Sequence, residues 1–187
     1  TSYSNLATVL QDLGDYEQAR SLLQKAISIG EKHFGTEHPN LATPYSNLAM
    51  VLQDLGDHAE AKALLQKAIS IGEKHLGNDH PNLATSYSNL AMVLQDLGDD
   101  DEAKRLLQKA INIEEKQLGN QHPTLVVSYA NLAMVLQDLG DYAEAKALMQ
   151  KAISIGEKRL GTAHPTMLAL YDNLAILQEK IDSNNKS

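Results

Sequence analysis

The sequence predicts an all-α solenoid built from pairs of helices, and three observations lead to that class. Landmark residues return every 42 positions along a chain of 187 residues. Glycines and prolines divide each repeat into two segments of helical length. Within each segment the apolar residues follow steps of three and four, which is the spacing of one helical face. A lone helix pair cannot bury its apolar stripes, so neighbouring pairs must stack around a shared core.

The 42-residue period is carried by several residue types. Tyrosine, asparagine and glycine each keep the step, and the repeated positions are Tyr3, Tyr45, Tyr87, Tyr129 and Tyr171; Asn5, Asn47, Asn89, Asn131 and Asn173; and Gly14, Gly56, Gly98 and Gly140. We therefore expect one array with repeats 1–42, 43–84, 85–126 and 127–168, a half-repeat 169–181, and a polar tail 182–187. This is about 4.5 repeats.

The elements of one repeat can be read in order in the second copy. The first helix is expected from about Pro39 to Leu55, because proline suits a first turn that has no use for its missing N–H. Gly56 is expected to end this helix as a left-handed cap. Asp57 then begins the second helix, which Gly77 ends.

Two local features of these helices carry further expectations. An acidic or amide residue follows each capping aspartate by three positions, which predicts a capping box at Asp15, Asp57, Asp99 and Asp141. Pro44 lies inside the expected first helix of repeat two, where it should kink the helix or delay its start.

The composition narrows the function classes. The chain carries a formal charge of −8 and has no cysteine. An acidic chain is a poor partner for nucleic acids or anionic membranes, which both favour basic patches. Without cysteine there is no disulfide framework or thiolate chemistry. No apolar run approaches the roughly 20 residues of a membrane helix. We expect a cytoplasmic protein.

No enzyme motif is present, and we expect neither catalysis nor a cofactor. The sequence has no glycine-rich phosphate loop, no G-x-S-x-G elbow and no H-E-x-x-H. One His-Pro pair per repeat cannot converge on a single metal ion, so the predicted role of His38, His80, His122 and His164 is to cap helix starts. Glycine recurs inside the second helices at Gly30, Gly72 and Gly156, but Glu114 replaces it in repeat three. That replacement predicts that the position is neither a tight contact nor a phosphate cradle.

The order Tyr45-x2-Leu48-Ala49-x2-Leu52, followed by Ala61-x3-Leu65-x2-Ala68, resembles the tetratricopeptide repeat. The 42-residue form, with its Leu-Gly-x-x-His-Pro and Asn-Leu-Ala segments, is similar to the repeats of kinesin light chains. The resemblance implies a right-handed superhelix whose first helices line a concave face. It also implies a protein-interaction scaffold that binds a peptide or a partner helix, without naming the partner.

The resemblance places the groove lining on the first helices. The predicted groove residues are Asn5, Asn47, Asn89, Asn131, Ser46, Ser88, Met50, Met92, Met134, Gln53, Gln95, Asp54, Asp96 and Asp138, with Thr43, Thr85 and Gln137 in the same set. Amides can donate and accept at once, and methionine adapts to several ligands. No lining position in repeats one to four is basic. A basic or polar partner is therefore expected rather than an acidic one.

Alternatives remain open for these residues and for the function. Each aspartate can instead bond to the next repeat or simply be solvated, and the methionines can fill the core. The alternative function is an architectural, assembly or sensor segment of a larger multidomain protein. Such a segment would associate with other copies through its exposed terminal helices.

Overall fold

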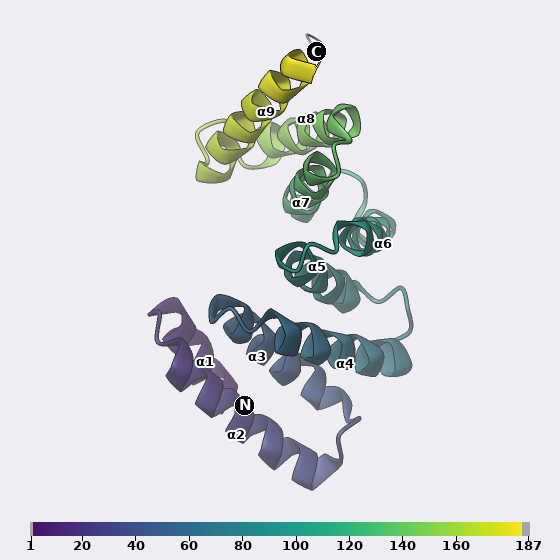
Figure 1. Ribbon diagram of the computed structural model, residues 1–187. Coiled ribbons are helices and arrows are strands. Elements are labelled where there is room, and N and C mark those ends of the chain that lie inside the picture. The colour runs from purple at the N-terminus through teal and green to yellow at the C-terminus, as the bar shows by residue number, and fades with distance from the viewer. Residues whose placement is uncertain (1, 185–187) are drawn as a thin grey trace. The chain divides into compact units, whose positions relative to one another are not determined.

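The computed structural model describes residues 2–184, and these residues form helices joined by short loops (Figure 1). The elements are α1 (Ser2–Asp12), α2 (Tyr16–Phe34), the 3-10 turn η1 (Pro39–Leu41), α3 (Ala42–Asp54), α4 (His58–Leu76), α5 (Pro81–Asp96), α6 (Asp100–Leu118), α7 (Thr124–Asp138), α8 (Tyr142–Arg159) and α9 (Pro165–Asn184). No strand occurs among these residues. The predicted all-α class is confirmed.

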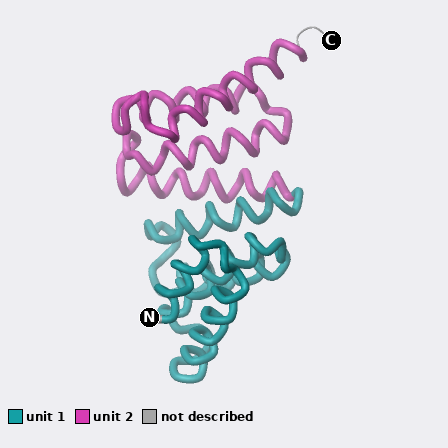
Figure 2. The backbone as a smooth tube through the Cα atoms, turned by 90° about the vertical axis from the view of Figure 1, so that its left-hand side faces the viewer, with its two compact units in different colours: residues 1–98 teal, residues 99–187 magenta. Residues whose placement is uncertain are grey.

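The helices form two compact units, residues 1–98 and 99–187 (Figure 2). In the first unit each helix packs against the next, from α1 to α5. In the second unit the same holds from α6 to α9. Each unit is therefore a stack of antiparallel helices.

The cores of both units are built from alanine, leucine and isoleucine, with one tyrosine per internal repeat. In repeat two, Ala49, Leu52, Ala61 and Leu65 are completely buried, and Tyr45 is almost so. The alanines matter because small side chains let two helix backbones approach closely, while the leucines fill the space between them. The apolar stripes read from the sequence are thus the faces that the stacked helices bury.

Glycines end the helices as predicted. Gly56 has a φ of +83° and Gly77 has the same value, a left-handed conformation that costs other residues free energy. The helix starts after the His-Pro pairs are capped by the histidine rings. The Nδ1 atom of His38 accepts a hydrogen bond from the Asn40 N–H at 3.2 Å. In the same way, the Nδ1 atoms of His80, His122 and His164 each accept from the backbone N–H of the residue two positions later. The predicted capping role of the histidines is confirmed.

The capping-box prediction is right at only one of its four sites. Asp15 accepts from the Gln18 N–H at 3.3 Å, but Asp57, Asp99 and Asp141 make no side-chain cap bond. In two cases the carboxylate turns to a basic residue of the preceding second helix. The Lys104 ammonium bonds Asp141 Oδ2 at 3.0 Å, and an Arg20 nitrogen lies 3.8 Å from Asp57 Oδ2. A cation within reach competes successfully with a backbone N–H.

Pro44 delays the start of its helix, as predicted. Helix α5 begins at Pro81, but in repeat two the residues from Pro39 form the 3-10 turn and α3 begins only at Ala42. Pro44 therefore lies in the first turn of α3, where a missing N–H leaves no hydrogen bond unmade. The helix expected over 39–55 is shortened for this reason.

The interpretation of the second-helix glycines is wrong, because they are tight contacts. A Cβ atom on Gly72 would lie 2.7 Å from Leu83 Cδ2, and one on Gly30 would lie equally close to Leu41 Cδ2. A Cβ on Gly156 would collide with the sulfur of Met167. Glu114 holds the equivalent position in repeat three, where its side chain is half-buried.

At the C-terminal end, α9 continues through Asp182 to Asn184, into the segment expected as a polar tail. Residues 185–187 of that segment lie outside the described residues. Across 2–184, no helix is both long and apolar enough to cross a membrane.

Candidate functional site

The predicted groove residues all lie on the first helices, and most of their side chains reach the surface. Met92 and Met134 are 39% and 44% exposed, which excludes the alternative that these two methionines fill the core. Asn47 and Asn89 are half-buried, and Asn5 on α1 is exposed. The first helices therefore present a surface of amides, hydroxyls and thioethers.

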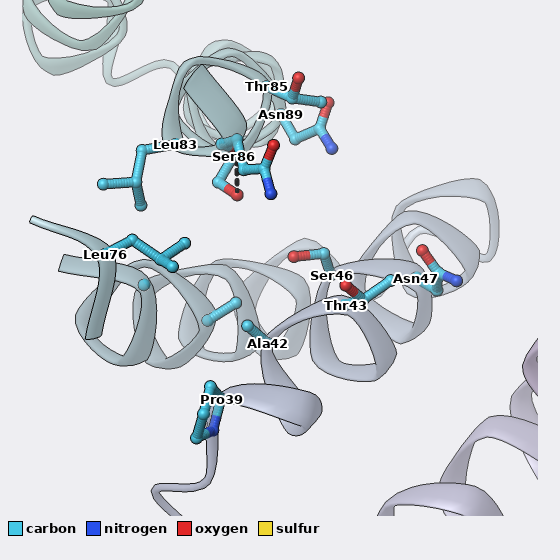
Figure 3. A pocket seen from close by; sticks show the side chains of 13 residues that line it. Pro39, Ala42, Thr43, Ser46, Asn47, Leu76, Leu83, Thr85, Ser86 and Asn89 are labelled. Carbon is cyan, nitrogen blue, oxygen red and sulfur yellow. Dashed lines mark hydrogen bonds between the residues drawn. The ribbon is translucent and has the colours of Figure 1, made fainter. Parts of the chain in front are cut away.

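In the first unit, part of this surface forms a pocket of about 320 Å³ between α3, α4 and α5. Figure 3 shows Ser46 and Asn47 on α3 and, on α5, Ser86 and Asn89. The residues that line the pocket are Pro39, Ala42, Thr43, Ser46, Asn47, Ala68, Gly72, Leu76, Asn82, Leu83, Thr85, Ser86 and Asn89. None of them carries a charge. The pocket thus brings together five predicted groove residues, Thr43, Ser46, Asn47, Thr85 and Asn89.

Most of the polar side chains in this pocket have no internal partner. Within residues 2–184, no hydrogen bond engages the side chains of Thr43, Ser46, Asn47, Thr85 or Asn89. The Ser86 hydroxyl, by contrast, donates a hydrogen bond to the Asn82 carbonyl at 3.4 Å. Side chains without internal partners keep their donors and acceptors for a ligand or for water.

The apolar side of the pocket comes from the second helix. Ala68, Gly72 and Leu76 of α4 meet Leu83 of α5 there, and the missing side chain of Gly72 is what lets Leu83 approach. Asn82 and Ser86 were missed in the sequence, although they precede Asn89 by seven and three residues on the same helical face. Extending the predicted face one turn toward the helix start would have found them.

The aspartates lie outside this pocket and connect neighbouring repeats. Gln11 Nε2 donates to Asp54 Oδ2 at 2.7 Å, and Gln53 Nε2 donates to Asp96 Oδ2 at 2.6 Å. The Nδ1 atom of His58 lies 3.4 Å from the same oxygen of Asp96. Both carboxylates are still exposed. These bonds agree with the alternative that the aspartates serve the repeat joints, and they leave the negative charge at the surface.

The second unit has a smaller and more apolar pocket of about 90 Å³. It contains three predicted groove residues, Met134, Gln137 and Asp138. Its full lining is Ala133, Met134, Gln137, Asp138, Met149, Asn173, Ile176 and Leu177. Asn131 is not part of it. Ile176 occupies in α9 the position that Met134 holds in α7, so this position stays apolar in the half-repeat.

A second polar constellation, which sequence reasoning missed, joins three successive helices. The Tyr45 hydroxyl donates to Glu31 Oε1 at 2.5 Å, and the Lys67 ammonium lies 3.1 Å from the same oxygen and 4.2 Å from the centre of the Tyr45 ring. We call this group the joint clamp. The second unit has the same clamp in Tyr129, Glu115 and Lys151, listed in the same order.

The joint clamp shifts the pKa of each of its members. The hydrogen bond from Tyr45 lowers the pKa of Glu31, while burial and the adjacent carboxylate raise the pKa of Tyr45. Burial disfavours the charge on Lys67, but its bonds to Tyr45 and Glu31 outweigh that cost and raise its pKa. The clamp therefore stabilises two opposite charges at a half-buried joint, a structural task. In the described part of the chain, no cluster of three His, Asp or Glu residues is placed to hold a metal ion.

A stack of helix pairs with periodic joints and a polar, uncharged pocket defines a helical repeat protein. Family profiles described as "Tetratricopeptide repeat" match residues 1–74, 41–116 and 82–136, and a second such profile matches residues 125–166. The chain belongs to the tetratricopeptide repeat family. A comparison with curated protein sequences gave no match.

Solved structures show the same fold. Two crystal structures of nearly identical TPR-like repeats from a putative kinesin light chain of Podosopora anserina, one of them a point variant, superpose with a TM-score of 0.85. They are 29% and 31% identical to this chain, cover 99% of it, and are themselves covered over 87% and 88% of their length. BtubC (BKLC) from P. vanneervenii also reaches a TM-score of 0.85 at 23% identity, over 96% of this chain and 72% of that one. The expected likeness to kinesin light chain repeats is confirmed.

Proposed function

We propose that the chain is a protein-interaction scaffold that holds an extended peptide or a partner helix on its first-helix surfaces. The observation that carries this proposal is the pocket of α3, α4 and α5. It combines amides and hydroxyls that have no internal partners with an apolar side formed by Leu76 and Leu83. A peptide offers alternating backbone donors and acceptors together with side chains, which is the chemistry that such a lining recognises.

The proposed division of labour follows from the side-chain types. Asn47 and Asn89 each provide an amide that can donate to a backbone carbonyl and accept from a backbone N–H. The apolar side of the pocket takes one uncharged side chain of the ligand. In the second unit, Met134 and Ile176 provide a further apolar contact that can adapt its shape.

The partner is proposed to be polar or basic rather than acidic, in the cytoplasm. The pocket lining contains no cation, so an acidic ligand would lose hydration there without gaining an ion pair. Asp54 and Asp96 keep exposed carboxylates on the same helices. This favours positive charge on the ligand beside, rather than inside, the pocket.

The test begins with an array of immobilised 15-residue peptides probed with the full chain. The affinity of the best peptide is then measured by fluorescence anisotropy for the wild type and for Asn47→Ala/Asn89→Ala. Losing two amide contacts should weaken binding by roughly tenfold. Asn112→Ala, an exposed amide on α6, is the matched control and should bind as the wild type does. An unchanged affinity in the double variant would remove the pocket from the binding site.

The alternative of an assembly segment has one observation of its own. Large apolar side chains of α1 are exposed, among them Leu6 and Val9. Sedimentation over a concentration series separates the two functions, because a peptide scaffold stays monomeric when the peptide is absent.

A further inference from the structure

Two positions differ between the joints that connect a second helix to the following first helix. In repeat two they hold Gly72 on α4 and Ser86 on α5, and both residues line the pocket. At the other joints at least one member of the pair is larger; the pairs there are Gly30 with Pro44, Glu114 with Ser128, and Gly156 with Leu170. Pro44 and Leu170 are buried. The small size of both Gly72 and Ser86 therefore leaves the pocket open.

Glu114 shows which kind of side chain fits at such a joint. It extends from α6 at the position that Gly72 holds in α4, and Ser128 on α7 corresponds to Ser86 on α5. The Glu114 carboxylate forms a hydrogen bond with the Ser128 side chain. Ser128 is only 5% exposed, whereas Ser86 is half-buried. In the second unit the chain thus supplies its own long polar side chain to a serine whose equivalent stays accessible in the first unit.

The negative charge of Glu114 does not suit this place. Burial raises the pKa of its carboxyl group, because the ionised form loses hydration there. Its Oε2 atom is buried and has no hydrogen-bond partner within residues 2–184. A glutamine side chain has the same shape without the charge, and its amide nitrogen donates where a carboxylate oxygen cannot. The side chain that fits such a joint best is therefore a neutral amide of this length.

The pocket of the first unit offers what an amide side chain needs. Figure 3 shows Leu83 and Ser86 of α5 on one side of it and Leu76 of α4 on the other. The Ser86 hydroxyl donates to the Asn82 carbonyl over a long 3.4 Å, so a ligand carbonyl can replace that acceptor. A water occupies about 30 Å³ in the liquid. A pocket of about 320 Å³ therefore has room for one such side chain and the backbone next to it.

We propose that this pocket is a subsite for a glutamine side chain of the ligand, bound as Glu114 is bound in the second unit. The glutamine carbonyl accepts from the Ser86 hydroxyl, and its amide nitrogen donates to the Asn47 side chain. Its methylene groups pack against Leu76 and Leu83. This inference rests on the proposed function, because it takes the ligand to be a peptide, and it adds which side chain the pocket selects.

The test starts from the tightest 15-residue peptide on the array. Each of its glutamines is replaced in turn by leucine and by glutamate, and the fluorescein-labelled peptides are titrated with the full chain by anisotropy. At one glutamine both replacements should weaken binding by roughly tenfold. Leucine leaves the polar groups of the pocket without partners, and glutamate brings a charge into a lining that has no cation.

Chain variants then locate that glutamine in the pocket. Ser86→Ala removes the proposed donor and should reduce the preference for glutamine over leucine to about twofold. Ser70→Ala, at an exposed serine of α4, is the matched control and should keep the preference.

A second pair of variants fills the pocket from within. Gly72→Glu gives the first unit the side chain that repeat three carries. Its comparison is Gly72→Ala, because both place a Cβ atom beside Leu83 and differ only in what extends beyond it. The glutamine peptide should bind Gly72→Glu at least about tenfold more weakly than Gly72→Ala, with equal helicity by circular dichroism.

Three results would overturn this inference and leave the scaffold function in place. The first is a peptide whose binding depends on Asn47 and Asn89 but which has no glutamine or accepts leucine at every glutamine. The second is a glutamine preference that survives Ser86→Ala, and the third is equal binding by Gly72→Glu and Gly72→Ala. If no peptide on the array binds, the proposed function fails, and this inference fails with it.

Discussion

Glu114 and Glu115 are neighbours in α6, yet the structure places their carboxylates in opposite electrostatic situations. Glu115 accepts from the Tyr129 hydroxyl and pairs with Lys151, and these contacts lower its pKa. Burial raises the pKa of Glu114, which the Ser128 hydroxyl only partly offsets. One side chain therefore gains from being ionised in the folded state, and the other loses.

Glu115→Gln should destabilise the chain at neutral pH by about 1 kcal/mol, because the clamp is half-exposed and solvent screens it. A lowered folded-state pKa gives stability that is present above the unfolded pKa of about 4.3 and is lost as the pH falls through the folded value. The difference from wild type should therefore fade below about pH 4. Urea unfolding of both proteins at pH 7 and at pH 3 measures this difference in unfolding free energy. Glu179→Gln on α9 is the control and should show no such pattern.

Glu114→Gln should change the unfolding free energy in the opposite direction and stabilise the chain. A raised folded-state pKa means that ionisation penalises the fold, and this penalty sets in as the pH rises past the unfolded value. Removing the charge should raise the unfolding free energy at pH 7 by about 0.5–1 kcal/mol and change little in acid, where both forms are neutral. A loss of stability at pH 7 would contradict this, and would show that the carboxylate has a partner worth more than its desolvation.

At the level of elements, α3 shows how one residue moves a helix boundary. Pro44→Ser restores the residue found at Ser86 and Ser128 and gives α3 back a backbone donor. The α-helix should then extend back toward Pro39, as α5 extends to Pro81. We expect a gain of about 1 kcal/mol, less than for a mid-helix proline because Pro44 already lies in a first turn. Hydrogen exchange should show slower exchange of the amides of residues 43–46; unchanged exchange would mean that another contact sets the start.

Helix α1 should open first when the chain is heated or exposed to denaturant. Among residues 2–184 its neighbours α2 and α3 leave one side of it open, and Leu6 and Val9 are exposed where their repeat-two equivalents are buried. Local unfolding is favoured where few apolar contacts must be broken. Native-state hydrogen exchange should find the lowest protection in residues 3–13. Equal protection in α1 and α3 would mean that something covers the exposed apolar side of α1.

The sequence determines the helices more completely than the joints between them. The 42-residue period, the glycine caps and the histidine caps depend on residues close together in the chain, so spacing alone predicts them. The joint clamp draws Glu31, Tyr45 and Lys67 from three helices, and no local pattern marks them as partners. The contact of Gly72 with Leu83 depends on the distance between two backbones. The predicted capping box at Asp57 failed because Arg20, far away in sequence, competes for its carboxylate.

The candidate site could likewise be predicted only where it does not depend on contacts between distant helices. The resemblance to a known repeat was enough to place Ser46, Asn47 and Asn89 on one surface, and the pocket brings them together. It could not show that the aspartates of the same helices accept hydrogen bonds from Gln11 and Gln53. Those bonds depend on the offset between successive first helices, which only the packed structure defines.

For the whole molecule, the remaining question is whether its net charge of −8 steers its ligand. Asp54, Asp96 and Asp138 recur one per repeat near the ends of the first helices, and each of them is exposed. A peptide with lysine or arginine beside one or two apolar anchors should therefore bind better than its acidic counterpart. Exposed charges are screened beyond about 8 Å at physiological ionic strength, so the preference should shrink as salt is added.

The decisive variant is Asp54→Asn/Asp96→Asn/Asp138→Asn. Asparagine keeps a side-chain oxygen that can accept from Gln11 and Gln53, so the joints can survive while three charges disappear. If the carboxylates steer the ligand, affinity for the best basic peptide should fall several-fold at low salt, and the two proteins should converge at high salt. Unchanged affinity and salt dependence, with helicity intact, would mean that the aspartates act only at the repeat joints. A fall in helicity or melting temperature would lead to the same conclusion, because the charge itself would then be holding the repeats together.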